Sequence, residues 1–465
     1  NTTASYNNAF GHNALGANIT GEENVAMGDN AVAANTTGNK LTAIGTSALA
    51  SNTTASQNTA IGYAALNANT TGTRNNAFGS LSLDATTTGN YNNAFGYSSL
   101  GANTTGEENV AIGDNAMLDN TTGDKNTAVG TSSLANNTTA SNNTAVGYLS
   151  LTANTTGTSN VAVGKSAMAA NTTADSNTAL GEDALLSNQT GADNTAVGRG
   201  ALANNTAANN TAVGRSALVS NTTGTDNTAY GNRAADSMTT GNYNTAIGSD
   251  SLNVATTGQY NTAVGISSGN KVSTGGLHTL IGQGAGGQLT TASNCLMLGY
   301  DSGQAGSPGG AITASNIIVL GDENITAAHI QVDWTVASDK RDKTDVTPME
   351  MGLDFVNKLE PVTYKWDKRS KYVEQGEDFK DLITDGTHKE DWLDTGFLAQ
   401  DVEKLESEYG YNIADKTNLT TTLSDDGNQY GLTYSKFVPM LVKAVQELST
   451  TVDELKQELK TLKGE

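Results

Sequence analysis

The sequence is dominated by a repeat of 17 residues. The pattern Asn-x-Ala-apolar-Gly recurs with its glycine at positions 11, 28, 45, 62, 79, 96, 113, 130, 147, 164, 181 and 198. After a one-residue deletion the glycine continues at 214, 231, 248, 265, 282 and 299, and a displaced copy ends at 321. A fixed period this short indicates one small structural unit that stacks on itself.

Each repeat unit has the residue pattern of strands and turns. Apolar residues fall just before the glycine and four residues after it, as Val129 and Leu134 do, and an Asn-Thr-Thr-Gly segment such as 120–123 follows. That segment predicts a turn, because Gly permits positive φ and Asn caps its own backbone. Apolar residues lack helical spacing, and Gly and Asn are too frequent for a helix. We expect two strands of about five residues and two tight turns per unit.

The predicted fold class is therefore mainly β, a parallel β-solenoid or β-roll with about 19 coils. At roughly 4.8 Å per coil the rod would be of order 90 Å long. An asparagine four residues before the glycine recurs from Asn7 to Asn261, with Leu41 as the exception. Stacked in register, these asparagines would form a ladder of side-chain amides along the rod axis.

A single coil of this size buries few large apolar side chains, so we expect several chains to assemble side by side. The repeats resemble the left-handed β-roll heads of trimeric autotransporter adhesins, which carry a similar Asn-x-x-Ala-Ile-Gly motif. The resemblance covers most of residues 6–300. It implies a trimeric rod, although the period of 17 is longer than is usual in those heads.

Composition changes sharply after the repeats. Residues 1–337 carry 8 Lys/Arg and 20 Asp/Glu, whereas the much shorter segment 338–465 carries 17 and 27. Such a shift predicts two architectures. We divide the chain into a solenoid shaft at 1–266, a neck of degenerate, Gly-rich repeats at 267–337, and a small α+β domain at 338–465.

Four blocks of sequence in the last domain belong together. They are 338–343 (Ser-Asp-Lys-Arg-Asp-Lys), 359–366 (Leu-Glu-Pro-Val-Thr-Tyr-Lys-Trp), 396–402 (Gly-Phe-Leu-Ala-Gln-Asp-Val), and Tyr434 with the run 438–448. In this order they resemble the intramolecular chaperones found on endosialidases and many phage tail spikes. That resemblance implies a domain that directs trimerisation and folding of the chain before it.

The same resemblance implies autoproteolysis between Ala337 and Ser338, with Ser338 as nucleophile and Lys343 as its base. Serine is a weak nucleophile unless a base takes its proton. The lysine must then be neutral near pH 7, so its pKa has to fall from about 10.4, which burial on assembly would favour. Asp342 stands beside the lysine where the family usually has Leu. On spacing alone, the alternative is that Ser338 caps a turn and Lys343 is a solvated charge.

Apolar residues at the C-terminus alternate spacings of three and four. This heptad pattern predicts a coiled-coil helix over 438–463. Its positions are Val438, Leu441, Val445, Leu448, Val452, Leu455, Leu459 and Leu462. Val at a with Leu at d favours two strands in model peptides, whereas the family resemblance implies three, and a helix buried within one chain is the alternative.

These features predict a structural fibre or spike of a viral tail. We expect a homotrimer on the virion that attaches to a host-surface receptor such as a glycan, with 338–465 released after assembly. The only enzymatic activity expected is single-turnover self-cleavage, with no cofactor or metal. Two other functions stay open: a glycan-degrading tail spike, and a solenoid adhesin that binds ice or another surface.

Charge and hydropathy exclude other classes. The net charge of −22 is opposite in sign to a nucleic-acid-binding surface, and no apolar run of about 18 residues would span a bilayer. The chain opens inside a repeat, at Asn1-Thr2-Thr3. We therefore expect a further portion upstream of residue 1.

Overall fold

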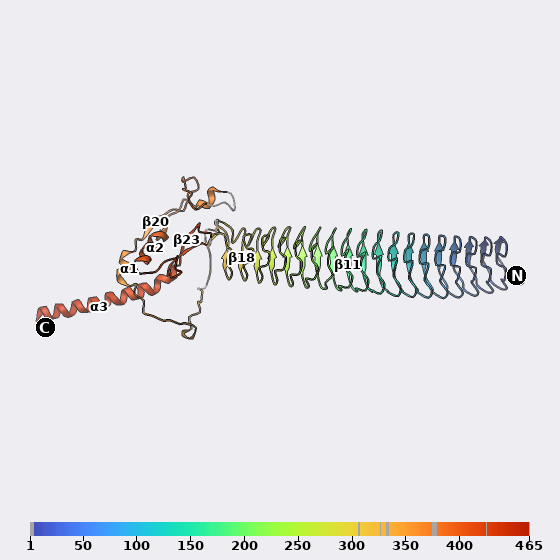
Figure 1. Ribbon diagram of the computed structural model, residues 1–465, viewed down its shortest axis with the longest axis horizontal. Coiled ribbons are helices and arrows are strands. Elements are labelled where there is room, and N and C mark those ends of the chain that lie inside the picture. The colour runs from blue at the N-terminus through green and yellow to red at the C-terminus, as the bar shows by residue number, and fades with distance from the viewer. Residues whose placement is uncertain are drawn as a thin grey trace. The chain divides into compact units, whose positions relative to one another are not determined.

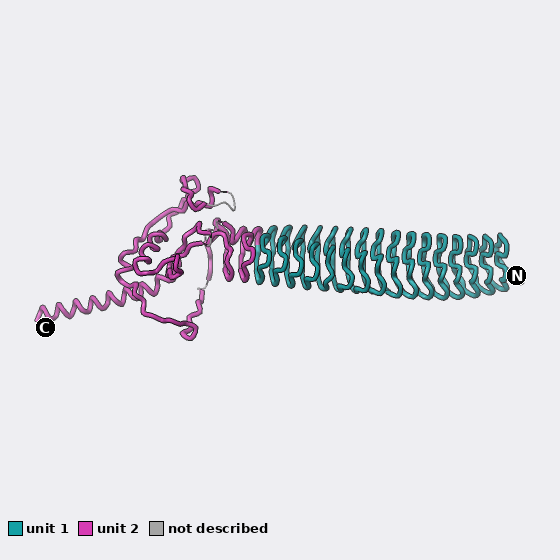
Figure 2. Tube along the Cα trace, viewed as in Figure 1, with its two compact units in different colours: residues 1–281 teal, residues 282–465 magenta. Residues whose placement is uncertain are grey.

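The computed structural model describes residues 4–305, 307–325, 327–331, 334–373, 379–424 and 426–464. The chain forms two compact units, 1–281 and 282–465 (Figure 2). The first is made of stacked coils, and the second contains the last coils and the α+β region. None of the described helices is long and apolar enough to cross a membrane.

The described coils contribute one three-residue strand each to a single parallel sheet of 19 strands (Figure 1). Neighbouring strands pair residue for residue, so that Thr127 lies opposite Thr144 and Ala128 opposite Ala145. The mainly β, parallel solenoid predicted from the repeat is confirmed. The strands are β1 (Asn8–Phe10), β2 (Val25–Met27), β3 (Thr42–Ile44), β4 (Thr59–Ile61), β5 (Asn76–Phe78), β6 (Asn93–Phe95), β7 (Val110–Ile112), β8 (Thr127–Val129), β9 (Thr144–Val146), β10 (Val161–Val163), β11 (Thr178–Leu180), β12 (Thr195–Val197), β13 (Thr211–Val213), β14 (Thr228–Tyr230), β15 (Thr245–Ile247), β16 (Thr262–Val264), β17 (Thr279–Ile281), β18 (Leu296–Leu298) and β19 (Ile318–Leu320).

The second strand that we expected in each coil is a series of turns instead. The residues two and four after the repeat glycine have left-handed backbones, as Ser132 (φ 53°) and Leu134 (φ 52°) do. A left-handed conformation costs a non-glycine residue of order 1 kcal/mol and interrupts an extended strand. The N–H of Leu134 nevertheless donates to the carbonyl of Ser150 at 2.9 Å, so hydrogen bonding between coils continues through the turns and offsets this cost.

The core of the solenoid is narrow. In most coils the strand's middle residue is an alanine and the residue four after the glycine is a leucine; both point inward, and Ala128 and Leu134 are fully buried. The residue directly before the glycine points outward, and Ile112 is 42% exposed. One large side chain per coil is therefore buried, while a second apolar column, the strand-end column, lies on the outer surface of the sheet.

The repeat glycine allows adjacent coils to approach closely. Gly130 has φ +133°, and a Cβ at this position would lie 2.5 Å from the carbonyl oxygen of Gly147 in the next coil. No side chain fits in that space. The motif therefore requires glycine for both backbone conformation and packing.

Two columns of buried asparagines run along the axis. In the first, four residues before the glycine, the Oδ1 of Asn126 accepts from the N–H of Asn143 at 3.0 Å, and its Nδ2 donates to the carbonyl of Ala140 at 2.8 Å. In the second, which opens each Asn-Thr-Thr turn, the Nδ2 of Asn137 donates to the Oδ1 of Asn120 at 2.8 Å. The predicted column does hydrogen-bond along the axis, but chiefly to backbone. The direct amide ladder belongs to the turn asparagines.

The coils become irregular in the second unit. Strand β17 continues the parallel pairing beyond residue 266 at the end of the first unit, and in the second unit β19 pairs with β18 after a longer connection. The boundary between the two units falls at residues 281 and 282.

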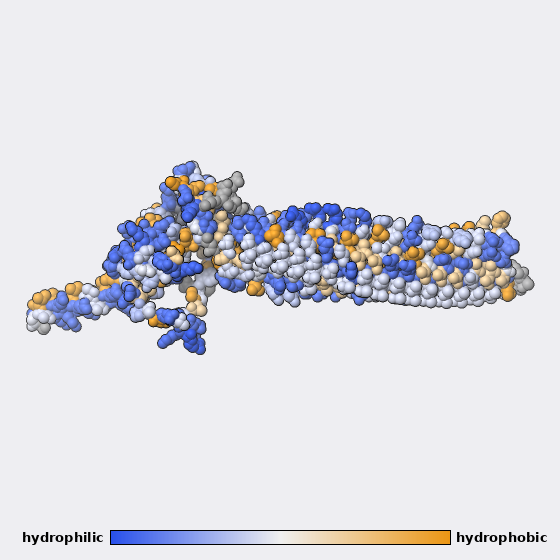
Figure 3. Space-filling view, in the orientation of Figure 1, coloured by the Kyte–Doolittle hydropathy of each residue, from blue (hydrophilic) through white to orange (hydrophobic). Residues whose placement is uncertain are grey.

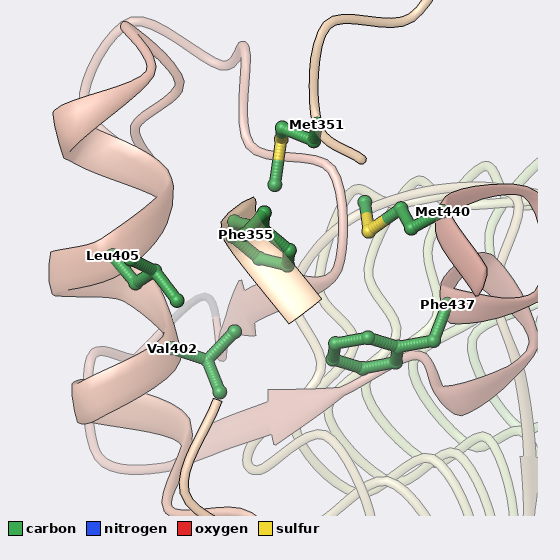
Figure 4. Close-up of a cluster of buried hydrophobic side chains, with 6 residues drawn as sticks. All are labelled: Met351, Phe355, Val402, Leu405, Phe437 and Met440. Atoms are coloured by element: carbon green, nitrogen blue, oxygen red, sulfur yellow. The ribbon is translucent and has the colours of Figure 1, made fainter. Parts of the chain in front are cut away.

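The described part of the α+β region contains three α-helices and two small antiparallel sheets, β20–β21 and β22–β23, with α1 against α3 and α2 against the β22–β23 sheet. Its buried apolar cluster is Met351, Phe355, Val402, Leu405, Phe437 and Met440 (Figure 4). The elements are η1 (Lys340–Asp342), α1 (Leu353–Lys358), β20 (Val362–Tyr364), η2 (Arg369–Tyr372), β21 (Asp394–Gly396), α2 (Ala399–Glu408), β22 (Thr421–Leu423), β23 (Tyr430–Leu432), η3 (Tyr434–Lys436) and α3 (Phe437–Lys463).

Candidate functional site

The segment 338–343 folds into a short capped turn. Asp339 precedes the 3-10 helix η1, and its side chain accepts a hydrogen bond from the N–H of Arg341 at 2.9 Å. The N–H of Lys343 then bonds to the carbonyl of Lys340 at 3.3 Å. This turn brings the first and last residues of the segment together.

The two residues chosen from the sequence as nucleophile and base are in direct contact. The Nζ of Lys343 lies 2.6 Å from the Oγ of Ser338 and donates a hydrogen bond to it. If the amine were neutral, the proton would pass from the Oγ of Ser338 to the Nζ of Lys343. A distance of 2.6 Å between these two atoms is within the range that general-base catalysis needs. Ala337, whose carbonyl would be attacked, is the residue directly before Ser338.

Arg341 is paired with a carboxylate within the same turn. Its Nη2 lies 2.6 Å from the Oδ2 of Asp339. The Arg341 guanidinium lowers the pKa of Asp339, and Asp339 in return raises the pKa of Arg341. The charge of Arg341 is therefore offset within its own turn.

The candidate site is open to solvent in the single chain. Ala337, Ser338, Asp342 and Lys343 are all exposed. Solvent stabilises the ammonium form of lysine, whereas burial favours the neutral amine. Shielding the Lys343 amine from water would therefore require a surface from outside the described part of this one chain.

The other sequence blocks meet in the fold. Strand β20, from the second block, pairs with β21, which ends at the Gly396 of the third. The hydroxyl of Tyr434, from the fourth block, accepts a hydrogen bond from the N–H of Phe397 at 3.2 Å. Gly396 has no room for a Cβ because this hydroxyl lies against it. The close approach of the hydroxyl explains why residue 396 is a glycine.

Residues 338–411 match the family described as chaperone of endosialidase. The match begins at Ser338 and includes the first three sequence blocks, while Tyr434 and α3 lie beyond it. No match was found among curated proteins or among solved structures. A region similar to this chaperone family thus follows a β-solenoid rod. We call residues 338–464 the chaperone region.

Two carboxylates of the chaperone region were not identified from the sequence. Glu406 is buried, and its oxygens accept from the N–H of Thr420 at 2.6 Å and from the hydroxyl of Thr421 at 2.6 Å. Glu447 accepts from the N–H of Leu353 at 2.7 Å and so joins α3 to α1. Glu406 carries one signal in the sequence, since it lies beside Val402 and Leu405 on the apolar face of α2.

Helix α3 has two apolar faces. Phe437, Met440 and Ala444 are buried, and α3 packs against α1. The heptad residues lie on another face and are exposed, from 40% at Val452 to 84% at Leu462. We call this second face the helix seam; hydrophobic atoms line one side of the helix in Figure 3. The seam is not covered by the described part of its own chain, which argues against a helix buried within one chain.

Proposed function

We propose that this chain is the structural fibre of a viral tail, a homotrimer whose chaperone region directs assembly and then cuts itself off between Ala337 and Ser338. One observation carries the proposal: the family match begins at Ser338, and the Oγ of this residue is 2.6 Å from the Nζ of Lys343. The rod before the cut is the lasting product. It acts on the virion by attaching to a host-surface receptor such as a glycan.

The cleavage proceeds in two steps. Lys343, when neutral, takes the proton of Ser338 while Oγ attacks the carbonyl carbon of Ala337. The Ala337–Ser338 C–N bond breaks, the amine of Ser338 gains a proton, and an ester joins the Ala337 carbonyl to Oγ. Water then hydrolyses the ester to a carboxylate on Ala337 and the free hydroxyl of Ser338. The reaction is a single turnover on the chain itself.

Assembly controls when this reaction begins. In one chain the segment 338–343 is exposed to solvent. Packing of neighbouring copies around the segment 338–343 removes water from the amine and favours its neutral form. Cleavage then follows trimer formation. The rod left behind cannot readily return to the assembly pathway and is kinetically stable.

Two exposed apolar surfaces support self-association. The strand-end column runs along the outside of the sheet, and Phe10, Ile112 and Leu180 are among its exposed members. The helix seam adds a second surface. Exposed apolar surfaces of this extent mark interaction sites, and burying them contributes about 25 cal/mol per Å². In parallel copies aligned along the rod axis, the strand-end column of one copy lies beside that of its neighbour, and the helix seams likewise lie side by side.

Register is the physical reason for a chaperone. Neighbouring coils present nearly the same surface, so two rods can slip by one coil at little cost. The helix seam does not repeat every 17 residues, so it can hold the copies together at one end in one register. Folding of the rods then proceeds from that end in a single register.

The test is mass spectrometry of the expressed chain. We expect fragments that end at Ala337 and begin at Ser338, and we expect Ser338→Ala and Lys343→Arg to abolish them. Lys340→Ala, a matched change of an exposed lysine in the same turn, should still be cut. An uncut wild-type trimer would refute self-cleavage. Cutting of Lys343→Arg at the wild-type rate would refute the role of Lys343.

A second function is favoured by one feature of the rod. The second threonine of each Asn-Thr-Thr turn is exposed, and Thr37, Thr54 and Thr71 form part of a regular column. Such a column presents hydroxyl and methyl groups at the coil spacing, a pattern suited to binding ordered water. Thermal hysteresis of the purified rod would support ice binding, and its absence would leave the fibre function alone.

A further inference from the structure

Two contacts within the second unit join residues on either side of the proposed cut. The N–H of Ala311 donates to the Oδ2 of Asp426 at 3.0 Å. The Nζ of Lys368 donates to the carbonyl oxygen of Glu323. Ala311 and Glu323 precede Ser338, whereas Lys368 and Asp426 follow it. Neither contact uses an atom of the bond that is cut.

In the first contact, the Asp426 carboxylate is held in position by its own β22–β23 turn. Asp426 lies in the turn between β22 and β23, where its Oδ1 accepts from the N–H of Asn428 at 3.0 Å. This second hydrogen bond holds the carboxylate in place while Oδ2 faces Ala311. A carboxylate that accepts from a backbone N–H makes a stronger bond than a neutral acceptor does.

On the other side of the first contact, the backbone at Gly310 leaves room for the β22–β23 turn. Gly310 has φ +75°, and a Cβ there would lie 2.8 Å from the Cβ of Ser424 and 2.9 Å from the Oδ1 of Asp426. A side chain at residue 310 would force the turn away. The missing side chain lets the two backbones approach, as the Ala311 contact requires.

The residue held in the second contact, Glu323, follows the last strand of the solenoid in the chain, whereas Ala311 precedes that strand. Strand β19 (Ile318–Leu320) falls between Ala311 and Glu323 in the chain, so the segments that enter and leave this coil are each held once. The Nζ of Lys368 is also 3.8 Å from a carboxylate oxygen of Glu390, and the Lys368 side chain is only 24% exposed. The lysine is therefore positioned by its own region.

We propose that Asp426 and Lys368 form a clamp that holds the chaperone region on the neck after the Ala337–Ser338 bond is cut. Cleavage and release are then separate steps. The inference rests on the proposed self-cleavage, because without a cut the clamp has nothing to retain. Until the clamp opens, it keeps the entering and leaving segments of the last coil in place.

The test compares two full-length proteins. The first is the wild-type chain, which cuts itself. In the second, the recognition sequence of a site-specific protease replaces residues 334–339, so that added protease makes the cut without Ser338. We expect both cut proteins to elute from size-exclusion chromatography at neutral pH with the two fragments together. Asp426→Ala and Lys368→Ala should each weaken retention by about tenfold or more, and the double variant should separate.

Controls distinguish the possible failures. The matched pair Asp391→Ala and Lys404→Ala changes exposed side chains of the same types and should leave retention unchanged. Lys368→Ala lies outside the hairpin, so it tests the clamp even if Asp426→Ala unfolds the turn. Separation of the parent fragments, or full retention by the double variant, would overturn the clamp. If the wild-type chain stays uncut while the protease-cut chain shows clamp-dependent retention, self-cleavage fails and the clamp stands.

Discussion

Asn103 and Asn120 occupy the same position in successive coils, and the Nδ2 of Asn120 donates to the Oδ1 of Asn103 at 2.9 Å. The turn asparagines repeat this bond along much of the rod, and the places where it is missing include coils in which another residue takes the position. Thr86 is one such residue. Below it, the buried Oδ1 of Asn69 has no hydrogen-bond partner among the described residues. Above it, the Nδ2 of Asn103 is 3.4 Å from the hydroxyl of Thr86.

Thr86→Asn should therefore stabilise the rod. The new amide can donate to Asn69 and accept from Asn103, and a completed hydrogen bond is worth about 0.5–1.5 kcal/mol. Denaturant unfolding of the rod measures the change. The reciprocal variant Asn120→Thr should destabilise the rod by about 1–3 kcal/mol, because Asn103 loses its donor. A less stable Thr86→Asn protein would show that the ladder contributes little.

Gly130→Ala should destabilise the solenoid severely. The added Cβ would lie 2.5 Å from the carbonyl oxygen of Gly147, at a φ of +133° that alanine rarely adopts. We expect a loss of at least about 2–3 kcal/mol, measured by thermal or denaturant unfolding. Gly200→Ser is the matched control. Gly200 has φ +67°, a Cβ there would meet only the Oγ of Ser216 at 4.0 Å, and Ser132 adopts φ 53° at the equivalent site, so the change should be nearly neutral.

The link between α3 and α1 should weaken in acid. The N–H of Leu353, and then Lys443, lower the pKa of Glu447 below its ordinary value of 4.5. A lowered pKa gives stability that is fully present above 4.5 and is lost as the pH falls through the lowered value. Unfolding of the chaperone region between pH 7 and 3 should show this loss. Glu447→Gln should remove that part of the pH dependence, whereas Glu458→Gln, an exposed carboxylate on the same helix, should not.

Leu455→Asp should disrupt self-association through the helix seam. Leu455 is exposed in the single chain, and a buried leucine contributes about 2–5 kcal/mol when it is packed. Sedimentation should show at least about a tenfold weaker assembly. Gln457→Asp introduces the same charge away from the seam and should leave assembly intact. If Leu455→Asp assembles like the wild type, the seam is not an interface.

Much of the rod could be predicted from the sequence because its rules are local and repeated. A 17-residue period with one residue type at each position predicts parallel, in-register stacking, and β1 to β19 confirm it. The number of strands per coil was predicted wrongly, as two where the described coils have one. It depends on the left-handed backbone at positions such as Ser132 and Leu134, which is maintained by hydrogen bonds to adjacent coils rather than by the preference of either residue.

The candidate site shows the same division. Ser338 and Lys343 were identified as partners from the resemblance to the chaperone family and not from their spacing, and the turn capped by Asp339 places them 2.6 Å apart. The sequence alone thus determined the repeat and its stacking, since both depend on residues repeated at a fixed period. Only the tertiary structure decided that the strand-end column faces outward and that Lys343 is exposed. Exposure depends on atoms contributed from distant parts of the chain, and local spacing carries no information about them.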